Sequence, residues 1–251
     1  MIAMNQERRA LSAPEPFVIL AMPRTGSHHL KALANEHPNV LTNGEILNPW
    51  DTDWPGVDRT EMSDRELLEL AFVRFPRRDE KYEVSCVGCK VNEPQFHERP
   101  TFFDELAAWP RLKVIALQRR NLLESFRSFI QARESGRWLA PSADGPAPVP
   151  PRVKLSPAGC ESYFRSAEEF YGRIFARFSP EKIHEIYYED LRDRPGECMA
   201  GIWDFLGVSP HLLSGCLLLQ QQETRPLSEA VLNYAELRGH FRGTPYQAFF
   251  E

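Results

Sequence analysis

The chain has 251 residues, of which 42% are hydrophobic and 26% are charged, and its formal net charge is −5. This composition is ordinary for a globular protein, and the acidic balance excludes a general positive field that would attract nucleic acid or anionic membranes. No run approaches the roughly 20 apolar residues of a membrane-spanning helix, and the five cysteines have no scaffold-like spacing, so we expect a cytoplasmic protein.

Strand-like and helix-like patterns alternate along the chain. Continuous apolar runs predict buried strands, at 17–22, 84–91, 112–117 and 183–188. Apolar residues at helical spacing predict helices between them, at 27–36, from 63 onward, 101–108, 122–138, 160–178 and 196–206. This order predicts an α/β fold in a single domain over residues 1–251, with a mainly parallel central sheet flanked by helices.

Three segments do not fit the alternation. Residues 1–15 are polar and are expected to be disordered, and residues 42–60 are rich in Asn, Pro, Trp and Asp and are expected to be irregular. Residues 139–157 hold several prolines and are expected to form an extended loop or lid. Cys86 and Cys89 form a CxxC pair beside an expected strand, but no further Cys or His pair completes a zinc site, so we expect a structural role.

The first strand leads directly into a turn of small and polar residues and then into a helix. The turn reads Pro23, Arg24, Thr25, Gly26 and Ser27, followed by His28. A strand, a small-residue turn and a helix together point backbone N–H groups at an anion. The lysine of nucleoside-triphosphatase loops is missing here. The segment therefore indicates a phosphate or sulfate cradle, with a simple helix cap as the alternative.

A second cationic segment follows the strand at 112–117. Arg119 and Arg120 stand at the end of this strand, and Ser128 lies two helical turns further on. Arginine forks and a serine hydroxyl suit phosphate oxygens. The alternative is that both arginines pair with Glu124 at the surface. Two anion sites at the carboxyl ends of strands favour a ligand with two phosphate-like groups lying across the sheet edge.

Together these segments resemble the two cofactor motifs of sulfotransferases that use 3′-phosphoadenosine-5′-phosphosulfate (PAPS). The run from Tyr188 to Val208 also resembles the late strand–helix unit of that family, and the resemblance extends from about residue 16 to the C-terminus. It implies a P-loop-like fold, a loop from Pro23 to His28 that binds the 5′-phosphosulfate, and a 3′-phosphate on Arg120 and Ser128. Many members have Ser or Thr at the position of His28, so the resemblance assigns it no catalytic role. Arg242 is a further cofactor candidate.

Residues 35–40, 43–49 and 87–95 resemble a rhizobial branch of this family that acts in nodulation. That resemblance implies transfer to the 6-hydroxyl of the reducing-end N-acetylglucosamine of a lipo-chitooligosaccharide Nod factor. A lipid-linked acceptor would place the protein peripherally at the inner membrane. Lipopolysaccharide, another polysaccharide and an aryl or tyrosine acceptor are alternatives. A nucleotide kinase would need a loop lysine and carboxylates for Mg²⁺, and a glycan-binding module would leave both anion sites unused.

The charges suggest how such a reaction would proceed. Negative charge builds on the leaving phosphate oxygen in a loose transition state, and Arg24 and Lys90 are the expected cations, without a metal. By resemblance to bacterial carbohydrate sulfotransferases, Glu45 is the expected base; the alternative is that Glu45 only holds acceptor hydroxyls. His28, His29 and Glu93 are other candidate bases.

Acceptor contacts are expected from side chains close in sequence to the expected base and lysine. Trp50 and Trp54 could stack on sugar rings, and Glu45 and Glu93 could bind hydroxyl groups. Packing in the core is the alternative for both tryptophans, because it explains most aromatic residues.

Overall fold

The computed structural model describes residues 13–75, 83–138, 149–215 and 225–251. Five strands form one sheet in which every pairing is parallel, in the order β2-β3-β1-β4-β5. The strands are β1 (Glu15–Ala21), β2 (Val40–Glu45), β3 (Cys86–Asn92), β4 (Lys113–Gln118) and β5 (Ile183–Tyr187). The central position of β1 explains its apolar sequence, because a strand buried on both faces has no polar side.

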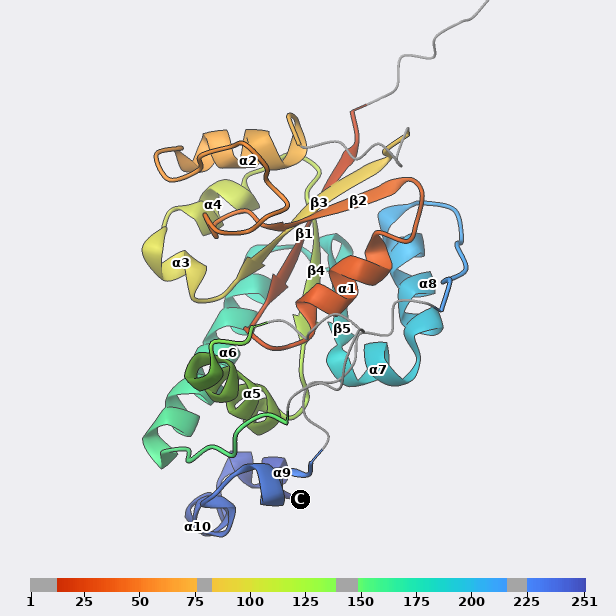
Figure 1. The fold of residues 1–251 in the computed structure, drawn as a ribbon. Coiled ribbons are helices and arrows are strands. Elements are labelled where there is room, and N and C mark those ends of the chain that lie inside the picture. The colour runs from red at the N-terminus through yellow and green to blue at the C-terminus, as the bar shows by residue number, and fades with distance from the viewer. Residues whose placement is uncertain (1–12, 76–82, 139–148, 216–224) are drawn as a thin grey trace, which may run out of the picture.

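Helices cover both faces of the sheet (Figure 1). One face packs against α1 (Ser27–Ala34), α7 (Tyr188–Asp193) and α8 (Pro195–Leu206). The other packs against α2 (Asp64–Phe72), α3 (Gln95–Glu98), α4 (Phe102–Ala107), α5 (Leu122–Ser135) and α6 (Pro157–Arg177). The chain ends with α9 (Leu227–Ala230), α10 (Tyr234–His240) and the 3₁₀ turn Pro245–Phe250, which join the same core as α5 and α6.

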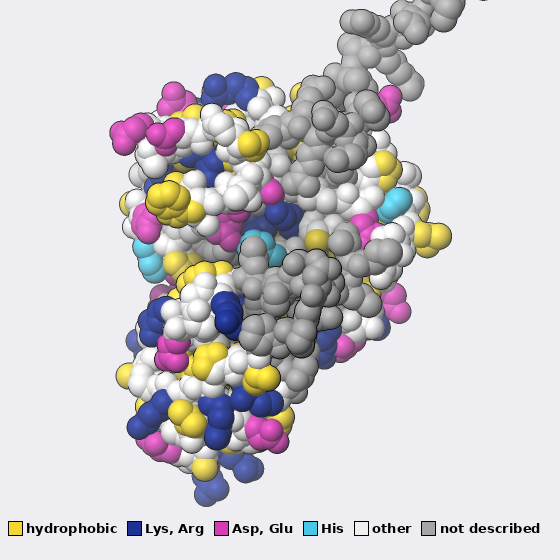
Figure 2. All heavy atoms as spheres, in the orientation of Figure 1, with side chains coloured by type: hydrophobic (Ala, Val, Ile, Leu, Met, Phe, Trp, Pro, Cys, Tyr) yellow, Lys and Arg dark blue, Asp and Glu magenta, His cyan; other side chains and the backbone are white. Residues whose placement is uncertain are grey.

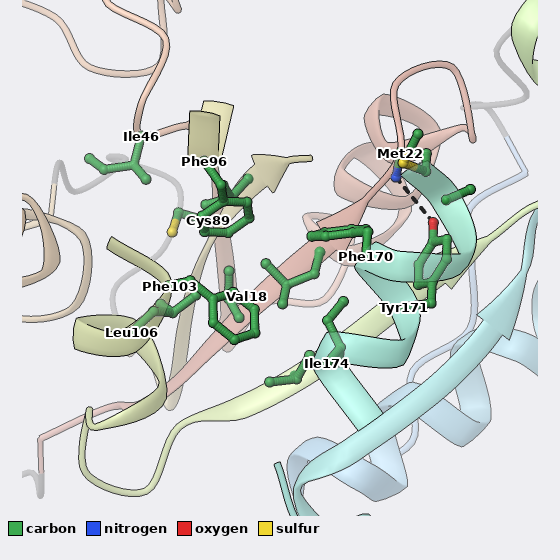
Figure 3. Close-up of a cluster of buried hydrophobic side chains, with 14 of the residues drawn as sticks. Val18, Met22, Ile46, Cys89, Phe96, Phe103, Leu106, Phe170, Tyr171 and Ile174 are labelled. Carbon is green, nitrogen blue, oxygen red and sulfur yellow. Dashed lines mark hydrogen bonds between the residues drawn. The ribbon is translucent and has the colours of Figure 1, made fainter. Parts of the chain in front are cut away.

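Alternate residues of β1 enter two separate hydrophobic cores. Phe17 and Ile19 face α1 and α8, whereas Val18 and Leu20 face α4 and α6. Figure 3 shows the second core, where Val18 lies among side chains from α4 and α6. The Tyr171 hydroxyl there accepts a hydrogen bond of 3.1 Å from the backbone N–H of Met22, which ties α6 to the end of β1.

The sheet order creates a switch point at the carboxyl end of β1. After β1 the chain builds β2 and β3 on one side, and it then crosses to build β4 and β5 on the other. Ligands of open parallel sheets bind where neighbouring connections diverge in this way. The segments following β1, β3 and β4 therefore meet at one edge of the sheet.

The predicted fold class is confirmed: the sheet is parallel, and the expected strands and long helices are present within a few residues of their predicted ends. The expectation of an irregular segment from residue 42 was wrong at its start, because Val40–Glu45 is β2. This strand lacks a continuous apolar run, and it is held in the sheet by pairing with β3.

The described part of the proline-rich segment is anchored to the body of the protein. Val153 is fully buried and forms a parallel bridge with Val231, and α6 already begins at Pro157. The proposed lid therefore cannot extend through residues 153–157; residues 139–148, like residues 1–12, lie outside the described part of the structure. None of the helices in the described residues is long and apolar enough to cross a membrane.

Candidate active site

The loop between β1 and α1 turns sharply through residues with positive φ. Arg24 has a φ of 67° and Gly26 a φ of 87°. A Cβ atom at Gly26 would lie only 2.5 Å from the ring of Tyr188. Glycine is therefore required at this position both for the left-handed backbone and for the close approach of Tyr188.

Helix α1 begins at this loop without a side-chain cap, whereas Ser63, Asn121 and Ser156 cap α2, α5 and α6. Among the described residues, no group accepts a hydrogen bond from the backbone N–H groups of 27–29. The positive end of the helix dipole is thus open to an anion. The Thr25 hydroxyl donates to the carbonyl of Met22 at 2.8 Å and stabilises the turn.

The side chain of Arg24 joins the two cationic segments. Its Nε donates to the Ser128 hydroxyl at 3.1 Å, and its Nη1 donates to the carbonyl of Trp138. Burial, followed by the positive charge of Arg119, lowers the pKa of Arg24, which nevertheless stays charged as a guanidinium does in proteins. Ser128 therefore lies beside the first loop, as a ligand bridging both segments would require.

Arg119 holds the backbone of this loop in place, a role that the sequence pattern did not indicate. Its Nη1 donates to the carbonyl oxygen of Arg24 at 3.2 Å, and its guanidinium stacks on the Tyr188 ring at 4.7 Å. Glu124 and Glu189 lie 3.6 and 3.9 Å from it and balance its charge. The alternative that the arginines pair with Glu124 therefore holds for Arg119, but this pair is largely buried and does not lie at the surface.

Arg120, by contrast, turns outward. It forms a two-pronged ion pair with Asp190 and lies over the ring of Tyr187, and half of its side chain is exposed. In this structure Arg120 therefore contacts Asp190 and Ser128 contacts Arg24, and the binding of a 3′-phosphate by Arg120 and Ser128 together stays a prediction. Arg242 is exposed after α10, which Figure 1 shows at the lower edge of the molecule beyond α5.

Glu45 lies at the centre of a polar cluster at the ends of β2 and β3. Its Oε1 accepts a hydrogen bond from Asn92 at 2.8 Å, and its Oε2 accepts from Gln95 at 3.0 Å and from Asn48 at 3.3 Å. His28 of α1 lies 3.7 Å from Oε1. These amides fix the direction of the carboxylate. Figure 2 shows a hollow on this side of the molecule, where acidic, basic and histidine side chains gather.

Lys90 is fully buried beside Glu45, with 3.6 Å between Nζ and Oε1. Its ammonium makes no hydrogen bond to any described residue. Burial lowers the pKa of Lys90 to about 8, with the charge of Glu45 opposing the shift and that of Lys31 adding to it. A buried ammonium with unused donors is costly unless a partner supplies acceptors, which keeps Lys90 a candidate for contact with an anionic ligand.

The positions of Glu45 and Lys90 depend on a bulge in β2. Thr42 pairs with Gly88 and Glu45 pairs with Lys90, so one extra residue of β2 lies between the two pairs. At the bulge, the carboxylate of Asp51 fills the space where a Cβ of Gly44 would lie, and it accepts a hydrogen bond from the Glu45 N–H at 2.8 Å. The bulge thus turns the Glu45 side chain toward Lys90.

The two candidate tryptophans differ. Trp50 is 87% exposed after β2, where it can contact a ligand, but Trp54 is 2% exposed and belongs to the core. The expectation that Trp54 stacks on a sugar is therefore wrong in this structure. The buried Arg59 causes the difference, because it donates to the carbonyls of Ile46 and Asn48 and folds the 46–54 loop inward.

Both histidines of α1 have a lowered pKa, which makes each a weaker base than a free imidazole. Burial, followed by the charges of Lys90 and Lys31, lowers the pKa of His28 to about 3, and burial lowers that of His29. Both therefore stay neutral near pH 7. His28 can orient or hydrogen-bond a ligand, whereas Glu45 is the carboxylate in direct contact with the lysine.

Glu93 lies on the other side of β3, where it lines a cavity of about 520 Å³ between the loop and helices α5 and α6. Its carboxylate lies 2.9 Å from His97, and burial raises its pKa.

Cys86 and Cys89 are free and buried, and burial raises the pKa of both thiols. No cluster of three His, Cys, Asp or Glu side chains suited to a metal occurs in the described residues.

Two solved structures share this fold. A sulfotransferase domain from the curacin biosynthetic pathway matches with a TM-score of 0.51 at 18% identity, over 94% of this chain and 89% of that one. A sulfotransferase domain from the olefin synthase of Synechococcus PCC 7002 matches with a TM-score of 0.50 at 19% identity, over 95% and 86%. At these identities the likeness concerns the fold alone.

Sequence comparison gives a closer relationship. Nodulation protein H from Rhizobium tropici is 54% identical over 242 residues, which cover 96% of this chain and 95% of the relative. Nodulation protein H from Rhizobium meliloti strain 1021 is 54% identical over 238 residues, covering 95% and 96%. The model of the sulfotransferase family matches residues 16–211, from the start of β1 to beyond α8. With the loop, the buried lysine and the neighbouring carboxylate all lying within this match, the chain belongs to the sulfotransferase family.

Proposed function

We propose that this enzyme transfers a sulfuryl group from PAPS to the 6-hydroxyl of the reducing-end N-acetylglucosamine of a lipo-chitooligosaccharide Nod factor. The observation that carries the proposal is the buried Lys90 ammonium, which has no hydrogen bond among the described residues and lies beside Glu45. Family membership supports the reaction, and the high identity to two nodulation proteins supports the acceptor.

The site has the groups that a phosphosulfate donor needs. The uncapped start of α1 offers N–H groups, and Arg24 and Lys90 offer positive charge on either side of the loop. PAPS supplies the sulfuryl group and a 5′-phosphate as leaving group. We expect Ser128, beside Arg24, to bind a second phosphate of the same ligand. Arg120 would join it only by exchanging its ion pair with Asp190.

In the proposed reaction, the acceptor oxygen attacks sulfur as the bond between sulfur and the leaving phosphate oxygen breaks. Negative charge then grows on that leaving oxygen, and Arg24, Lys90 and the first N–H groups of α1 stabilise it. These donors are fixed by the fold before the reaction, so little reorganisation opposes the step.

Glu45 accepts the proton of the attacking hydroxyl. Three amide groups orient its carboxylate, and the ammonium of Lys90 lies on one side of it. A positioned base of this kind contributes about 10²–10⁴-fold to a rate. The products are the sulfated sugar and 3′-phosphoadenosine 5′-phosphate (PAP), and the proton stays on Glu45 until it passes to water.

The test is a transfer assay with ³⁵S-labelled PAPS and chitooligosaccharides, with and without an N-acyl chain, and without added metal. Label on the reducing-end sugar is the expected result. Label found only with lipopolysaccharide or phenolic acceptors would overturn the acceptor and keep the reaction. Absence of both transfer and PAP binding, for folded protein, would overturn the reaction itself.

A further inference from the structure

Two buried tyrosines of α6 contact the backbone at the two PAPS segments, which are residues 23–28 after β1 and residues 119–128 after β4. Tyr163 precedes Tyr171 by about two helical turns, so both side chains lie on a similar side of the helix. Burial raises the pKa of both phenols. Each hydroxyl therefore keeps its proton near pH 7 and can donate as well as accept a hydrogen bond. Neither tyrosine has a role in the proposed reaction.

The Tyr171 hydroxyl joins the ends of the two strands that lead into the PAPS segments. It accepts a hydrogen bond of 3.1 Å from the Met22 N–H, which Figure 3 shows, and it donates one of 2.6 Å to the Leu117 carbonyl. Met22 directly follows β1, and Leu117 belongs to β4. Ala21 and Leu117 form the last pair between these strands. Tyr171 therefore holds the backbone at the point where the two PAPS segments begin to diverge.

Tyr163 makes a similar contact with the first PAPS segment. Its hydroxyl lies 3.0 Å from the carbonyl oxygen of Pro23 and 2.8 Å from the Ser125 hydroxyl of α5. Ser125 is fully buried, and its hydroxyl lies 3.2 Å from the same carbonyl oxygen. Ser128, which contacts Arg24, follows on the next turn of α5. Tyr163 thus connects the first PAPS segment with the helix that carries part of the second.

The separation of the two PAPS segments is important for a ligand with two phosphates. In PAP the 5′-phosphate and the 3′-phosphate belong to one nucleotide, so both bind well only when the segments hold the matching separation. Binding of the second phosphate is then an intramolecular step, and its gain in affinity depends on geometry. A nucleotide with a single phosphate uses one segment alone, so its affinity does not depend on the separation.

We propose that Tyr171 and Tyr163 are positioning residues that set the separation of the two PAPS segments and thereby make the enzyme selective for a nucleotide phosphorylated at both its 3′ and its 5′ positions. The inference rests on the proposed function, because it takes PAPS as the sulfuryl donor. It adds that a helix outside both PAPS segments determines how well the nucleotide fits.

The test compares the dissociation constants of PAP, adenosine 5′-monophosphate and adenosine 3′-monophosphate, measured by calorimetry. The variants are Tyr171→Phe, Tyr163→Phe and the double variant, which remove hydroxyl groups and keep the rings. Tyr234→Phe is the matched control. The Tyr234 hydroxyl of α10 also donates to a backbone carbonyl, that of Phe250 at 2.9 Å, in a contact that involves neither PAPS segment.

For the unaltered enzyme we expect PAP to bind at least tenfold more tightly than either monophosphate. Tyr171→Phe and Tyr163→Phe should each weaken PAP binding about fivefold, as for one hydrogen bond of typical net strength, and should change the affinity of each monophosphate less than twofold. The double variant should lose most of the preference for PAP, and Tyr234→Phe should keep it.

A purely structural role would weaken the binding of all three nucleotides by the same factor and leave the preference for PAP unchanged. An unchanged preference in a folded single variant would overturn the role of that tyrosine. Unchanged preferences in both single variants would overturn the proposal, and this comparison remains decisive when the double variant does not fold.

The same titrations separate this inference from the proposed function. A reduced preference for PAP in the variants, in an enzyme that transfers no sulfuryl group from PAPS to any acceptor, would support the inference and overturn the proposed reaction. PAP binding no tighter than monophosphate binding in the unaltered enzyme would overturn the inference whatever the enzyme transfers.

Discussion

Lys90 and Glu45 occupy paired positions on β3 and β2, with their charged atoms 3.6 Å apart and the ammonium completely buried. In the proposed reaction, the pair unites a cation for the leaving group with a base for the attacking group on one side of the sheet. Each residue then makes a separate prediction, because one acts through its charge and the other through proton transfer.

The charge of Lys90 predicts an alkaline limit to activity. Its pKa is lowered to about 8, so the ammonium is present below that pH and is lost as the pH rises through it. We expect kcat/KM for the donor to fall about tenfold between pH 7 and pH 9, since about one ammonium in ten stays protonated one unit above its pKa. In Lys90→Arg, which stays charged, this fall of kcat/KM at alkaline pH (the alkaline limb) should disappear. A limb at the same pH in that variant would assign it to another group.

Removing the base should affect turnover far more than binding. In Glu45→Gln we expect kcat to fall at least tenfold, because a base contributes about 10²–10⁴-fold. Calorimetry should show PAP binding nearly unchanged. Full turnover in this variant, with the chemical step shown to limit the rate, would rule out Glu45 as the base.

Arg119 should act on the donor alone. Its hydrogen bond to the Arg24 carbonyl supports the left-handed turn of the loop, so Arg119→Gln should raise the Kd of PAP about tenfold, near the ~1.5 kcal/mol of a bond from a charged donor. KM for the acceptor should stay constant. Arg177→Ala, an exposed change at the end of α6, is the control. Equal effects on donor and acceptor would indicate general loosening instead.

A comparison of two glycines separates the backbone cost of a positive φ from the cost of a Cβ contact with Tyr188. Gly26 and Gly56 both have positive φ, but only at Gly26 does a Cβ meet another group, the Tyr188 ring. Gly56→Ala should lower the free energy of unfolding by about 1–2 kcal/mol from the backbone alone. Gly26→Ala should lower it further and weaken PAP binding. Equal losses in denaturant titrations would show that Tyr188 yields to the added methyl group.

The parts of the site nearest β1 could be predicted from the sequence because local patterns determine them. The apolar run, the turn and the helical spacing after Gly26 each depend on neighbours in the chain, and the structure has all three. Strand β2 could not be recognised, because its six residues include Thr42, Asn43 and Gly44, and its burial comes from β3 and the helices.

Side-chain partners were harder to predict than backbone elements. Arg119 and Arg120 are adjacent and chemically identical, yet one lies under the loop and the other pairs with Asp190 at the surface. Their tertiary partners distinguish them: Arg119 contacts the loop after β1, whereas Arg120 contacts Asp190 of α7. The expectation that Trp54 contacts a sugar failed for a similar reason: its polar neighbours suggested a ligand site, and the buried guanidinium of Arg59 folds that loop inward, so the alternative of core packing holds.

The proposed chemistry depends on the bulge between Thr42 and Glu45 as well as on which residues the chain contains. Deleting Gly44 would keep Glu45, Lys90 and His28 in the sequence and would restore regular pairing of β2 with β3. Side chains alternate along a strand, so Glu45 and Lys90 would still share one face, but the carboxylate of Asp51 would lose the space beside Gly44 from which it accepts the Glu45 N–H. A chain of this family could thus lose the hydrogen bond that positions its proposed base through a one-residue deletion while every residue of the proposed reaction centre remained.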